Sequence, residues 1–284
     1  MRRIPGGVLD GAIGTELIAR GLRVGREPAE AWNLSHPDVL RKLHAAYFAA
    51  GAEAVQTNTF GGTRLRLTQF RRQADVRSLN LAACLLAREA RPTGKRVVGS
   101  IGPTGAIPPP EGRADLIELE DNFAEQAMIL AEGGVDVLHL ETFYHPKEAR
   151  AAARGAREGA PGLPIVGSMT CKLSERGGYA TAMGFHPEVM LAAFLEEGVD
   201  GVGVNCMLPP GPMVELIMLI RQRTPLPIWA RPTGKPTEGP PVDPEELARI
   251  SEDLFAAGAT AVGGCCGTGP AHIQALAAQV QGPL

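Results

Sequence analysis

Residues 201–231, GVGVNCMLPPGPMVELIMLIRQRTPLPIWAR, contain the pattern that decides the fold. Gly201-Val-Gly-Val-Asn205 and Pro227-Ile-Trp-Ala-Arg231 are short apolar runs with β-branched residues, which are typical of buried strands. Between them, Pro212 to Arg223 has the longer amphipathic spacing of a helix. It opens with proline, whose fixed φ and missing N–H suit the first helical turn. The stretch therefore predicts a strand, a helix and a second strand in succession.

The same succession recurs along the chain. The expected strands are Gly7–Asp10, Ala54–Thr57, Val97–Ile101, Asp136–Glu141, Pro164–Met169, Gly201–Asn205, Pro227–Arg231 and Thr260–Gly264. The expected helices are Pro37–Ala50, Leu119–Glu132, Pro187–Glu197, Pro212–Arg223, Pro244–Ala257 and Pro270–Val280. Several of these helices are followed by a glycine, which is the usual C-terminal stop. The glycines are Gly51, Gly133, Gly198 and Gly258.

Eight strands that alternate with helices predict a (β/α)8 TIM barrel, in which parallel strands are surrounded by a ring of helices. The 284 residues suit one such domain over residues 1–284. The long spacing between the second and third strands predicts an extra helix over Asp75–Ala90. A doubly wound open sheet is the alternative fold. In a barrel, the loops after the strands, including 102–112 and 232–241, form the face that carries active sites.

Bulk composition excludes several functional classes. A net charge of −3 and 5% aromatic residues provide neither the basic footprint nor the stacking platform of a nucleic-acid binder. No apolar run reaches the roughly 18 residues of a membrane span, and the N-terminus lacks the apolar core of a signal peptide. We therefore expect a cytoplasmic protein that binds neither nucleic acid nor membrane. The five cysteines, an odd number, argue against a disulfide framework and favour metal binding or catalysis.

Polar and thiol side chains gather where the predicted strands end. They are Asp10, Asn58, Ser100, Glu141, Asn205, Cys206, Cys265 and Cys266. In a barrel these residues share one mouth, and the sixth and eighth strands are near neighbours, so Cys206 can approach the adjacent pair Cys265 and Cys266. Three thiolates suit Zn²⁺ and leave a fourth tetrahedral position open, as in catalytic zinc sites. We therefore predict that these three cysteines bind zinc.

Other interpretations stay open at this point. The adjacent cysteines could form a redox pair. The glycine-rich stretch 263–269, which precedes a predicted helix, resembles a turn that binds phosphate in a TIM-barrel lyase or isomerase. Cys84 and Cys171 are expected to pack in the core, because cysteine is among the most buried residue types. His139 alternates with leucines and is expected to be a packed strand residue.

Six motifs, in order along essentially the whole chain, resemble the homocysteine S-methyltransferase family. They are Asp10-Gly-Ala-Ile-Gly-Thr-Glu-Leu17, Gln56-Thr-Asn-Thr-Phe-Gly61, Gly99-Ser-Ile-Gly-Pro103, Glu141-Thr142, Gly203-Val-Asn-Cys206 and Gly263-Gly-Cys-Cys-Gly-Thr268. The Asn-Cys and Gly-Gly-Cys-Cys-Gly motifs are the most specific. The family consists of zinc-dependent (β/α)8 barrels, among them the homocysteine module of cobalamin-dependent methionine synthase and the betaine and S-methylmethionine enzymes. The motifs of this chain are most similar to those of the methionine synthase module.

The resemblance implies an activity. Zinc held by Cys206, Cys265 and Cys266 would take the sulfur of homocysteine as its fourth ligand. A free thiol has a pKa near ~8.5, and coordination to the metal favours the deprotonated, nucleophilic form. This sulfur would attack an electrophilic methyl group, and methionine would leave.

The resemblance also implies roles for the residues around the zinc. Asp10 and Glu141 would bind the ammonium group of homocysteine. Ser100 and backbone amides near Gly11 would bind its carboxylate, and Asn205 would orient the site.

The methyl donor is left open. Trp32-Asn-Leu-Ser-His-Pro37 and Asn58-Thr-Phe-Gly61 resemble the methionine synthase module, whose methyl group is linked to methylcobalamin and methylfolate. Glu141-Thr-Phe-Tyr-His-Pro146 instead resembles the betaine branch. The sequence has no Asp-x-His-x-x-Gly corrinoid-binding motif, so we expect the donor to be a separate corrinoid protein or a small molecule such as betaine or S-methylmethionine. A non-catalytic subunit of a split methionine synthase, which binds zinc and homocysteine, is the alternative function.

Overall fold

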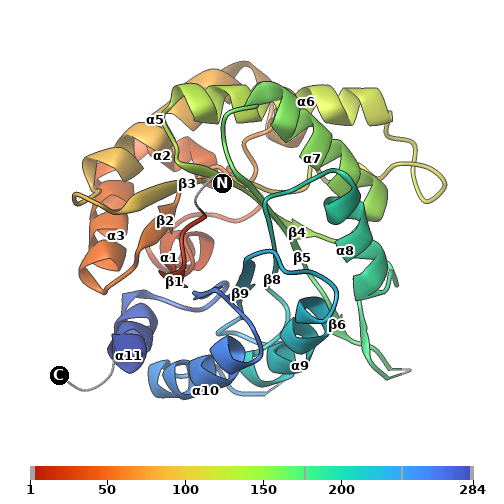
Figure 1. Ribbon diagram of the computed structural model, residues 1–284. Helices are drawn as coiled ribbons and strands as arrows, with labels where there is room; N and C mark the ends of the chain where they lie inside the picture. The colour runs from red at the N-terminus through yellow and green to blue at the C-terminus, as the bar shows by residue number, and fades with distance from the viewer. Residues whose placement is uncertain (1–3, 176, 238, 282–284) are drawn as a thin grey trace.

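The computed structural model describes residues 4–175, 177–237 and 239–281. Eight parallel strands form one sheet in the order β1-β10-β9-β8-β5-β4-β3-β2. Their bounds are β1 Gly7–Val8, β2 Ala54–Gln56, β3 Arg96–Ile101, β4 Val137–Phe143, β5 Ile165–Met169, β8 Gly201–Asn205, β9 Ile228–Arg231 and β10 Ala261–Val262. A parallel bridge from Leu9 to Ala54 joins the two ends of this order, so the sheet closes on itself (Figure 1). The predicted (β/α)8 barrel is confirmed, and the open sheet is wrong.

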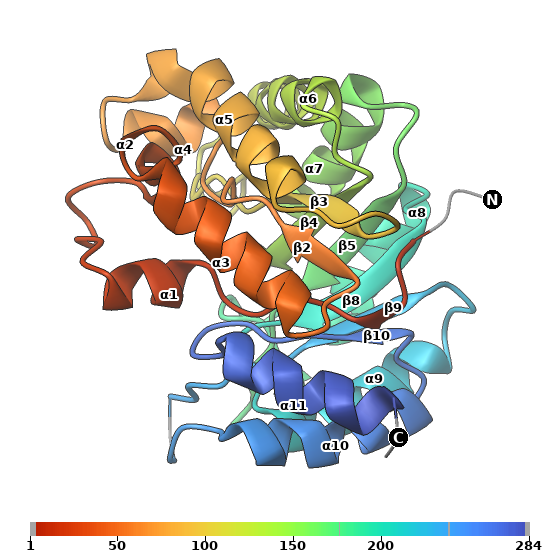
Figure 2. The same ribbon diagram turned by 90° about the vertical axis from the view of Figure 1, so that its left-hand side faces the viewer.

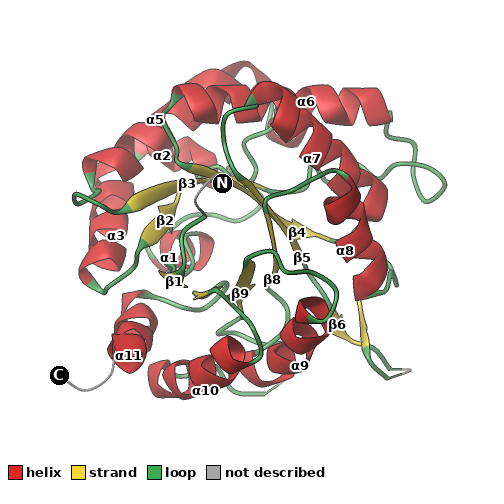
Figure 3. Ribbon diagram, in the orientation of Figure 1, coloured by secondary structure: helices red, strands yellow, loops and turns green. Residues whose placement is uncertain are grey.

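Helices surround the strands on the outside of the barrel (Figure 3). The outer helices are α3 Pro37–Ala49, α5 Val76–Glu89, α6 Leu116–Glu132, α7 Pro146–Gly159, α8 Pro187–Glu196, α9 Pro210–Arg221, α10 Pro244–Ala256 and α11 Pro270–Gln281. Shorter helices are α1 Gly14–Ala19, α2 Trp32–Ser35, α4 Arg64–Thr68 and the 3-10 turns Ala29–Ala31 and Gln73–Asp75. The helix expected over Asp75–Ala90 is confirmed as α5. None of the helices in the described part of the chain has the length and apolar character that a membrane span requires.

Two insertions mark the end of the barrel where the strands terminate. The segment after β1 carries α1 and lies at the end of the barrel opposite the N-terminus (Figure 2). An antiparallel hairpin, β6 Lys172–Leu173 and β7 Tyr179–Ala180, follows β5 and projects from the ring. These insertions add walls to the mouth of the barrel.

The interior of the barrel beneath this mouth is apolar. One cluster takes a buried side chain from almost every strand or its flanking residue: Leu9, Ala54, Val98, Val137, Val166, Trp229 and Ala261, with Ile4 packed against it. This plug fills the barrel, as is usual for the fold. Polar side chains nearer the carboxyl ends of the strands therefore lie above a buried, apolar floor.

The structure shifts some of the predicted boundaries. The first and last strands end at Val8 and Val262, because the chain bends there toward the site and Gly264 N–H donates to the carbonyl of Asp10 at 3.0 Å. Helix α6 starts three residues earlier than expected, because the Asp115 side chain caps it. Of the expected glycine stops, Gly133 has a φ of −65° and the left-handed turn falls on Gly134, with a φ of 78°.

Helix α7 was not predicted. Its buried face consists mainly of alanines at 149, 151, 152, 153 and 156, so the apolar spacing of larger side chains is missing from its sequence. Small residues there bring α7 close to α6. A Cβ on Gly155 would lie 2.3 Å from the carbonyl oxygen of Glu120 in α6.

We predict that Gly155→Ala destabilises the protein, although alanine is normally the better helix former by about 1 kcal/mol. The added methyl group collides with backbone, so we expect the free energy of unfolding to fall by about 1–3 kcal/mol. Gly14→Ala in α1 is the matched control, because, apart from its chain neighbours, no heavy atom lies within 4 Å of its Cβ position. This control should leave stability unchanged or raise it. Urea denaturation followed by circular dichroism measures both, and equal stabilisation by the two changes would contradict the prediction.

Candidate functional site

Polar side chains from neighbouring strands meet at the mouth of the barrel. They belong to Asp10 after β1, Gln56 in β2, Ser100 in β3, Glu141 in β4, Asn205 in β8 and Arg231 in β9, and all are buried. A cavity of about 250 Å³ opens among them. Its wall includes Ser100, Glu141, Arg231, Cys206, Cys265 and Cys266. A cavity of this size suits a small metabolite.

Three cysteine sulfur atoms converge on one side of this cavity. The Sγ atoms of Cys206 and Cys266 are 3.8 Å apart, and the Sγ atoms of Cys206, Cys265 and Cys266 all lie within 4.8 Å of one another. A tetrahedral zinc ion with Zn–S bonds of about 2.3 Å separates its sulfur ligands by about 3.8 Å. The donor set and its spacing therefore fit a metal ion with soft ligands. The predicted convergence of the three cysteines is confirmed.

Strand β9 holds the two cysteine segments side by side. The N–H of Cys206 donates to the carbonyl of Arg231 at 3.0 Å, and the N–H of Cys265 donates to the carbonyl of Pro232 at 2.9 Å. Both β8 and β10 pair with β9, so segments that are distant in sequence meet across one strand. At the adjacent pair the chain has room to bend only because residue 264 is glycine, since a Cβ there would lie 2.1 Å from Thr268 Oγ1.

Hydrogen bonds among the three thiols couple their pKa values. The thiol of Cys206 interacts with the sulfurs of Cys265 and Cys266, which raises the pKa of Cys206, and the same contact with Cys206 lowers the pKa of Cys266. A thiolate therefore forms first at Cys266, the exposed member of the group. A metal ion that binds here must displace the remaining thiol protons, so its affinity rises with pH.

Asn205 orients the backbone beside the cluster. Cys206, Met207 and Thr142 have left-handed φ angles of 61°, 44° and 66°, which cost about 1–3 kcal/mol each and persist only where neighbours enforce them. At Thr142 the neighbour is Asn205, whose Oδ1 accepts from the backbone N–H at 2.8 Å and whose Nδ2 donates to Oγ1 at 2.6 Å. Asn205 Nδ2 also donates to Glu141 Oε2 at 3.2 Å. These contacts support the orienting role that the resemblance implies for Asn205.

Glu141 is the carboxylate that lines the cavity at the end of β4. Its Oε1 accepts from Gln56 Nε2 at 2.8 Å and from the hydroxyl of Ser100. Burial raises the pKa of Glu141 to about 7, although the positive charge of Arg231 opposes this shift. Near neutral pH this carboxyl can therefore switch its charge when a cation arrives. A contact between Ser100 and a substrate carboxylate, as the resemblance implies, would require its hydroxyl to leave Glu141.

His139 supports this arrangement from inside the barrel. Its Nδ1 is 3.0 Å from Gln56 Nε2, and its Nε2 is 2.7 Å from Ser168 Oγ. Burial lowers the pKa of His139 well below its ordinary value, so the ring is neutral. His139 is a packed strand residue, as expected, and it fixes the Gln56 amide that holds Glu141.

Asp10 is paired with Arg231. Asp10 Oδ1 accepts from Arg231 Nη1 at 2.8 Å, and Oδ2 accepts from the N–H of Gln56 at 2.7 Å. Both charged side chains are almost completely buried, with exposed fractions of 1% for Asp10 and 3% for Arg231. Burial raises the pKa of Asp10, and the charge of Arg231 counteracts this. The role of Asp10 in binding the substrate ammonium group stays a prediction.

Two charged residues of the cavity wall were not found from the sequence. Arg231 is the last residue of a strand that was expected, so its position could have identified it in the same way as Glu141. Glu30 precedes α2, follows no strand, and accepts from the N–H of Gly61 at 2.6 Å. No strand-end pattern could have indicated Glu30.

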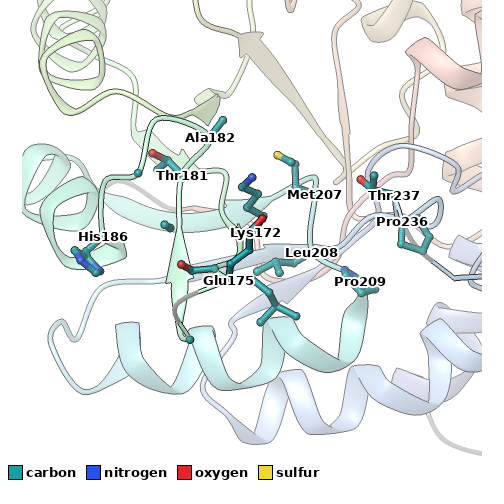
Figure 4. A pocket seen from close by; sticks show the side chains of 15 residues that line it. Lys172, Glu175, Thr181, Ala182, His186, Met207, Leu208, Pro209, Pro236 and Thr237 are labelled. Atoms are coloured by element: carbon teal, nitrogen blue, oxygen red, sulfur yellow. The ribbon is translucent and has the colours of Figure 1, made fainter. Parts of the chain in front are cut away.

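A larger hollow of about 950 Å³ lies beside the cluster of three cysteines. The β6–β7 hairpin contributes Lys172 and Thr181, and the loops after β8 and β9 contribute Met207 and Pro236. Thr181 lies on one side of the hollow and Pro236 on the other (Figure 4). Met207 directly follows Cys206, so this space adjoins the cluster.

The cysteines outside the cluster have the expected packing role. Cys84 and Cys171 are both completely buried, and burial raises the pKa of each to about 12. Neither thiol contributes to the mouth of the barrel.

Comparisons with known sequences agree on one family. A family model described as homocysteine S-methyltransferase matches residues 7–280. Methionine synthase from Mycobacterium tuberculosis (strain ATCC 25618 / H37Rv) is 33% identical over 293 residues, and methionine synthase from Mycobacterium leprae (strain TN) is 32% identical over 293 residues. Each match covers 95% of this chain but 24% of the relative. The chain thus spans about a quarter of the length of these relatives.

Solved structures show the same fold. The metallated form of the homocysteine methyltransferase MmuM from Escherichia coli superposes with a TM-score of 0.79 at 24% identity, covering 96% of both chains. Its apo form gives a TM-score of 0.74 at 25% identity, covering 96% of this chain and 95% of that chain.

The raised pKa of Glu141 predicts a pH-dependent cost of folding. The unfolded carboxyl ionises near its ordinary pKa of 4.5 and the folded one near 7, so stability falls as pH rises through this window. We expect the free energy of unfolding of wild type, relative to Glu141→Gln, to decrease by up to about 3 kcal/mol between pH 4.5 and 7. Urea denaturation of the metal-free, reduced protein measures it. Glu158→Gln, an exposed position on α7, controls for the loss of one charge. A difference between wild type and Glu141→Gln that does not change with pH would contradict the prediction.

Proposed function

Because the chain belongs to the homocysteine S-methyltransferase family, we propose that it transfers a methyl group to the thiol of homocysteine and forms methionine. One observation carries the proposal. The same cavity wall contains three cysteine sulfurs and, with them, the ionisable carboxyl of Glu141 and the guanidinium of Arg231. This arrangement suits a ligand that has a thiol at one end and the charged groups of an amino acid at the other. The family match also favours methyl transfer over the phosphate-binding lyase or isomerase and over a redox pair.

We further propose that Cys206, Cys265 and Cys266 hold Zn²⁺. Three thiolates are a soft donor set, and the similar fold of MmuM has been solved in a metallated form. When bound, zinc would favour the deprotonated form of the substrate thiol at neutral pH.

The remaining residues bind and orient the substrate. Glu141 receives the ammonium group and gives up its own proton as it does so, because a nearby cation stabilises the carboxylate. Gln56 and Ser100 hold Glu141 Oε1, and Asn205 holds Oε2. The amino acid is thereby fixed with its sulfur toward the cysteines. In the transfer, the sulfur forms a bond to the methyl carbon while the bond between methyl and donor breaks, and the electron pair of that bond stays with the donor.

The donor is proposed only by class. Similarity to methionine synthases, together with the motifs that resemble their homocysteine module, favours a methylcobalamin-linked or methylfolate-linked methyl group. The resemblance of residues 141–146 to the betaine branch keeps a small ammonium or sulfonium donor as the alternative. The hollow of about 950 Å³ next to Met207 offers room for a donor larger than an amino acid.

The proposal is tested by methionine formation from homocysteine with zinc-loaded protein and each of four donors: S-methylmethionine, betaine, methylcobalamin and methyltetrahydrofolate. Turnover with a sulfonium or ammonium donor would identify a self-sufficient methyltransferase. Turnover with methylcobalamin alone would identify the homocysteine half of a split methionine synthase. Binding of zinc and homocysteine without turnover of any donor, even with a corrinoid protein present, would instead indicate the non-catalytic subunit.

We predict that Cys206→Ala loses both bound zinc and activity. Two thiolates leave the tetrahedral site short of a ligand, so protein prepared with reductant should retain much less than one equivalent of zinc by atomic absorption. Cys84→Ala is the matched control, since it removes a buried thiol outside the cluster. Equal zinc content in the two variants, or a well-folded wild type without zinc, would exclude the zinc site.

A further inference from the structure

Arg231 brings a buried positive charge to the cavity wall. It ends β9, between the two cysteine segments, and its side chain is 3% exposed. A buried guanidinium is costly unless acceptors satisfy its N–H groups, so its contacts show what it is used for.

The contacts of Arg231 are incomplete. Nη1 donates to Asp10 Oδ1 at 2.8 Å, and Nη2 donates to the carbonyl of Gly11 at 3.3 Å. Nε is buried and has no hydrogen-bond partner among the described residues. An unsatisfied buried donor costs about 1–3 kcal/mol, so the protein itself does not fully compensate the buried charge of Arg231, and an anion in the cavity that Arg231 lines would add to that compensation.

Asp10 and Arg231 lie differently with respect to the cavity. Arg231 and Gly11 line the cavity, whereas Asp10 is not part of its wall and lies behind them. Asp10 Oδ2 is held by the N–H of Gln56 at 2.7 Å, which leaves Oδ1 directed at the guanidinium. Asp10 thus anchors Arg231 from the side away from the cavity.

On the basis of the proposed function, we propose that Arg231 binds the α-carboxylate of homocysteine and that Asp10 is the positioning residue that holds Arg231. Arg231, Glu141 and Cys265 line the same cavity. An α-amino acid carries its carboxylate and ammonium on one carbon, which matches an arginine beside a glutamate. The thiol then extends by two methylene groups toward the cysteines, and the backbone carbonyl of Arg231 already holds Cys206.

The inference predicts which thiols the pocket accepts. Homocysteine carries both charged groups, 3-aminopropane-1-thiol lacks only the carboxylate, and 4-sulfanylbutanoate lacks only the ammonium group. Wild type should bind homocysteine roughly tenfold or more tightly than 3-aminopropane-1-thiol, which corresponds to about 1.4 kcal/mol for one charge-assisted contact.

The test is isothermal titration calorimetry of the three thiols with zinc-loaded protein under reductant, comparing wild type with Arg231→Gln. We expect the variant to lose roughly tenfold or more in affinity for homocysteine and for 4-sulfanylbutanoate, and to bind 3-aminopropane-1-thiol as well as wild type does. Equal losses for all three thiols would assign Arg231 a purely structural role and overturn the inference. Wild type that does not distinguish homocysteine from 3-aminopropane-1-thiol would overturn it without any variant.

A second variant covers the possibility that Arg231→Gln is unstable because it leaves Asp10 charged and unpaired. Asp10→Asn with Arg231→Gln removes both charges together, and its melting temperature shows whether it is folded. The same selective loss for the two carboxylate-containing thiols is expected, and a non-selective loss would overturn the inference. If the proposed function itself is wrong, the result differs from both of these outcomes, because zinc-loaded wild type would then bind none of the three thiols.

Discussion

The pairing of β8 and β10 with the strand between them sets the distance between the cysteines, and the rest of the site depends on that distance. Hydrogen bonds from Cys206 to the carbonyl of Arg231 and from Cys265 to the carbonyl of Pro232 are extensions of this pairing. Because two consecutive carbonyls, of Arg231 at the end of β9 and of Pro232 directly after it, hold both segments, the three sulfurs meet without a covalent link. The same strand end supplies the Arg231 side chain, so the positions of the three cysteines and of a charged cavity residue are fixed by one element.

The polar layer above the apolar plug behaves as one unit. In a buried environment each charge needs a specific partner, and here Asp10 pairs with Arg231 while Gln56 connects Asp10, His139 and Glu141. Glu141 is the member that changes its protonation state near neutral pH, because its pKa is raised to about 7. An incoming ammonium group can therefore complete the layer at modest cost, whereas removal of any one member leaves a buried partner unsatisfied.

Much of this arrangement could be predicted from the sequence, for identifiable reasons. Strands such as Val97–Ile101 have β-branched residues on both faces and need no tertiary information, and the convergence of Cys206 with Cys265 and Cys266 follows from barrel topology. Helix α7 could not be recognised, because its alanines owe their burial to close contact with α6. The Asp10–Arg231 pair was also missed, since two residues at opposite ends of the chain show no pattern until strands β1 and β9 flank β10.

The barrel is closed by a single bridge, from Leu9 to Ala54, and we call this β1–β2 junction the seam. At this seam β1 and β2 share one bridge, whereas each of the other neighbouring strand pairs in the described ranges aligns at least two residues. Local opening follows the weakest pairing, so amide hydrogen exchange should start here. Asp10 directly follows β1 at this weak pairing, and its carboxylate accepts a hydrogen bond from Arg231 of β9, beyond β10. A ligand that binds Arg231 would therefore also stabilise the β1–β2 pairing through Asp10. Binding in the pocket would slow the local opening of the first strand.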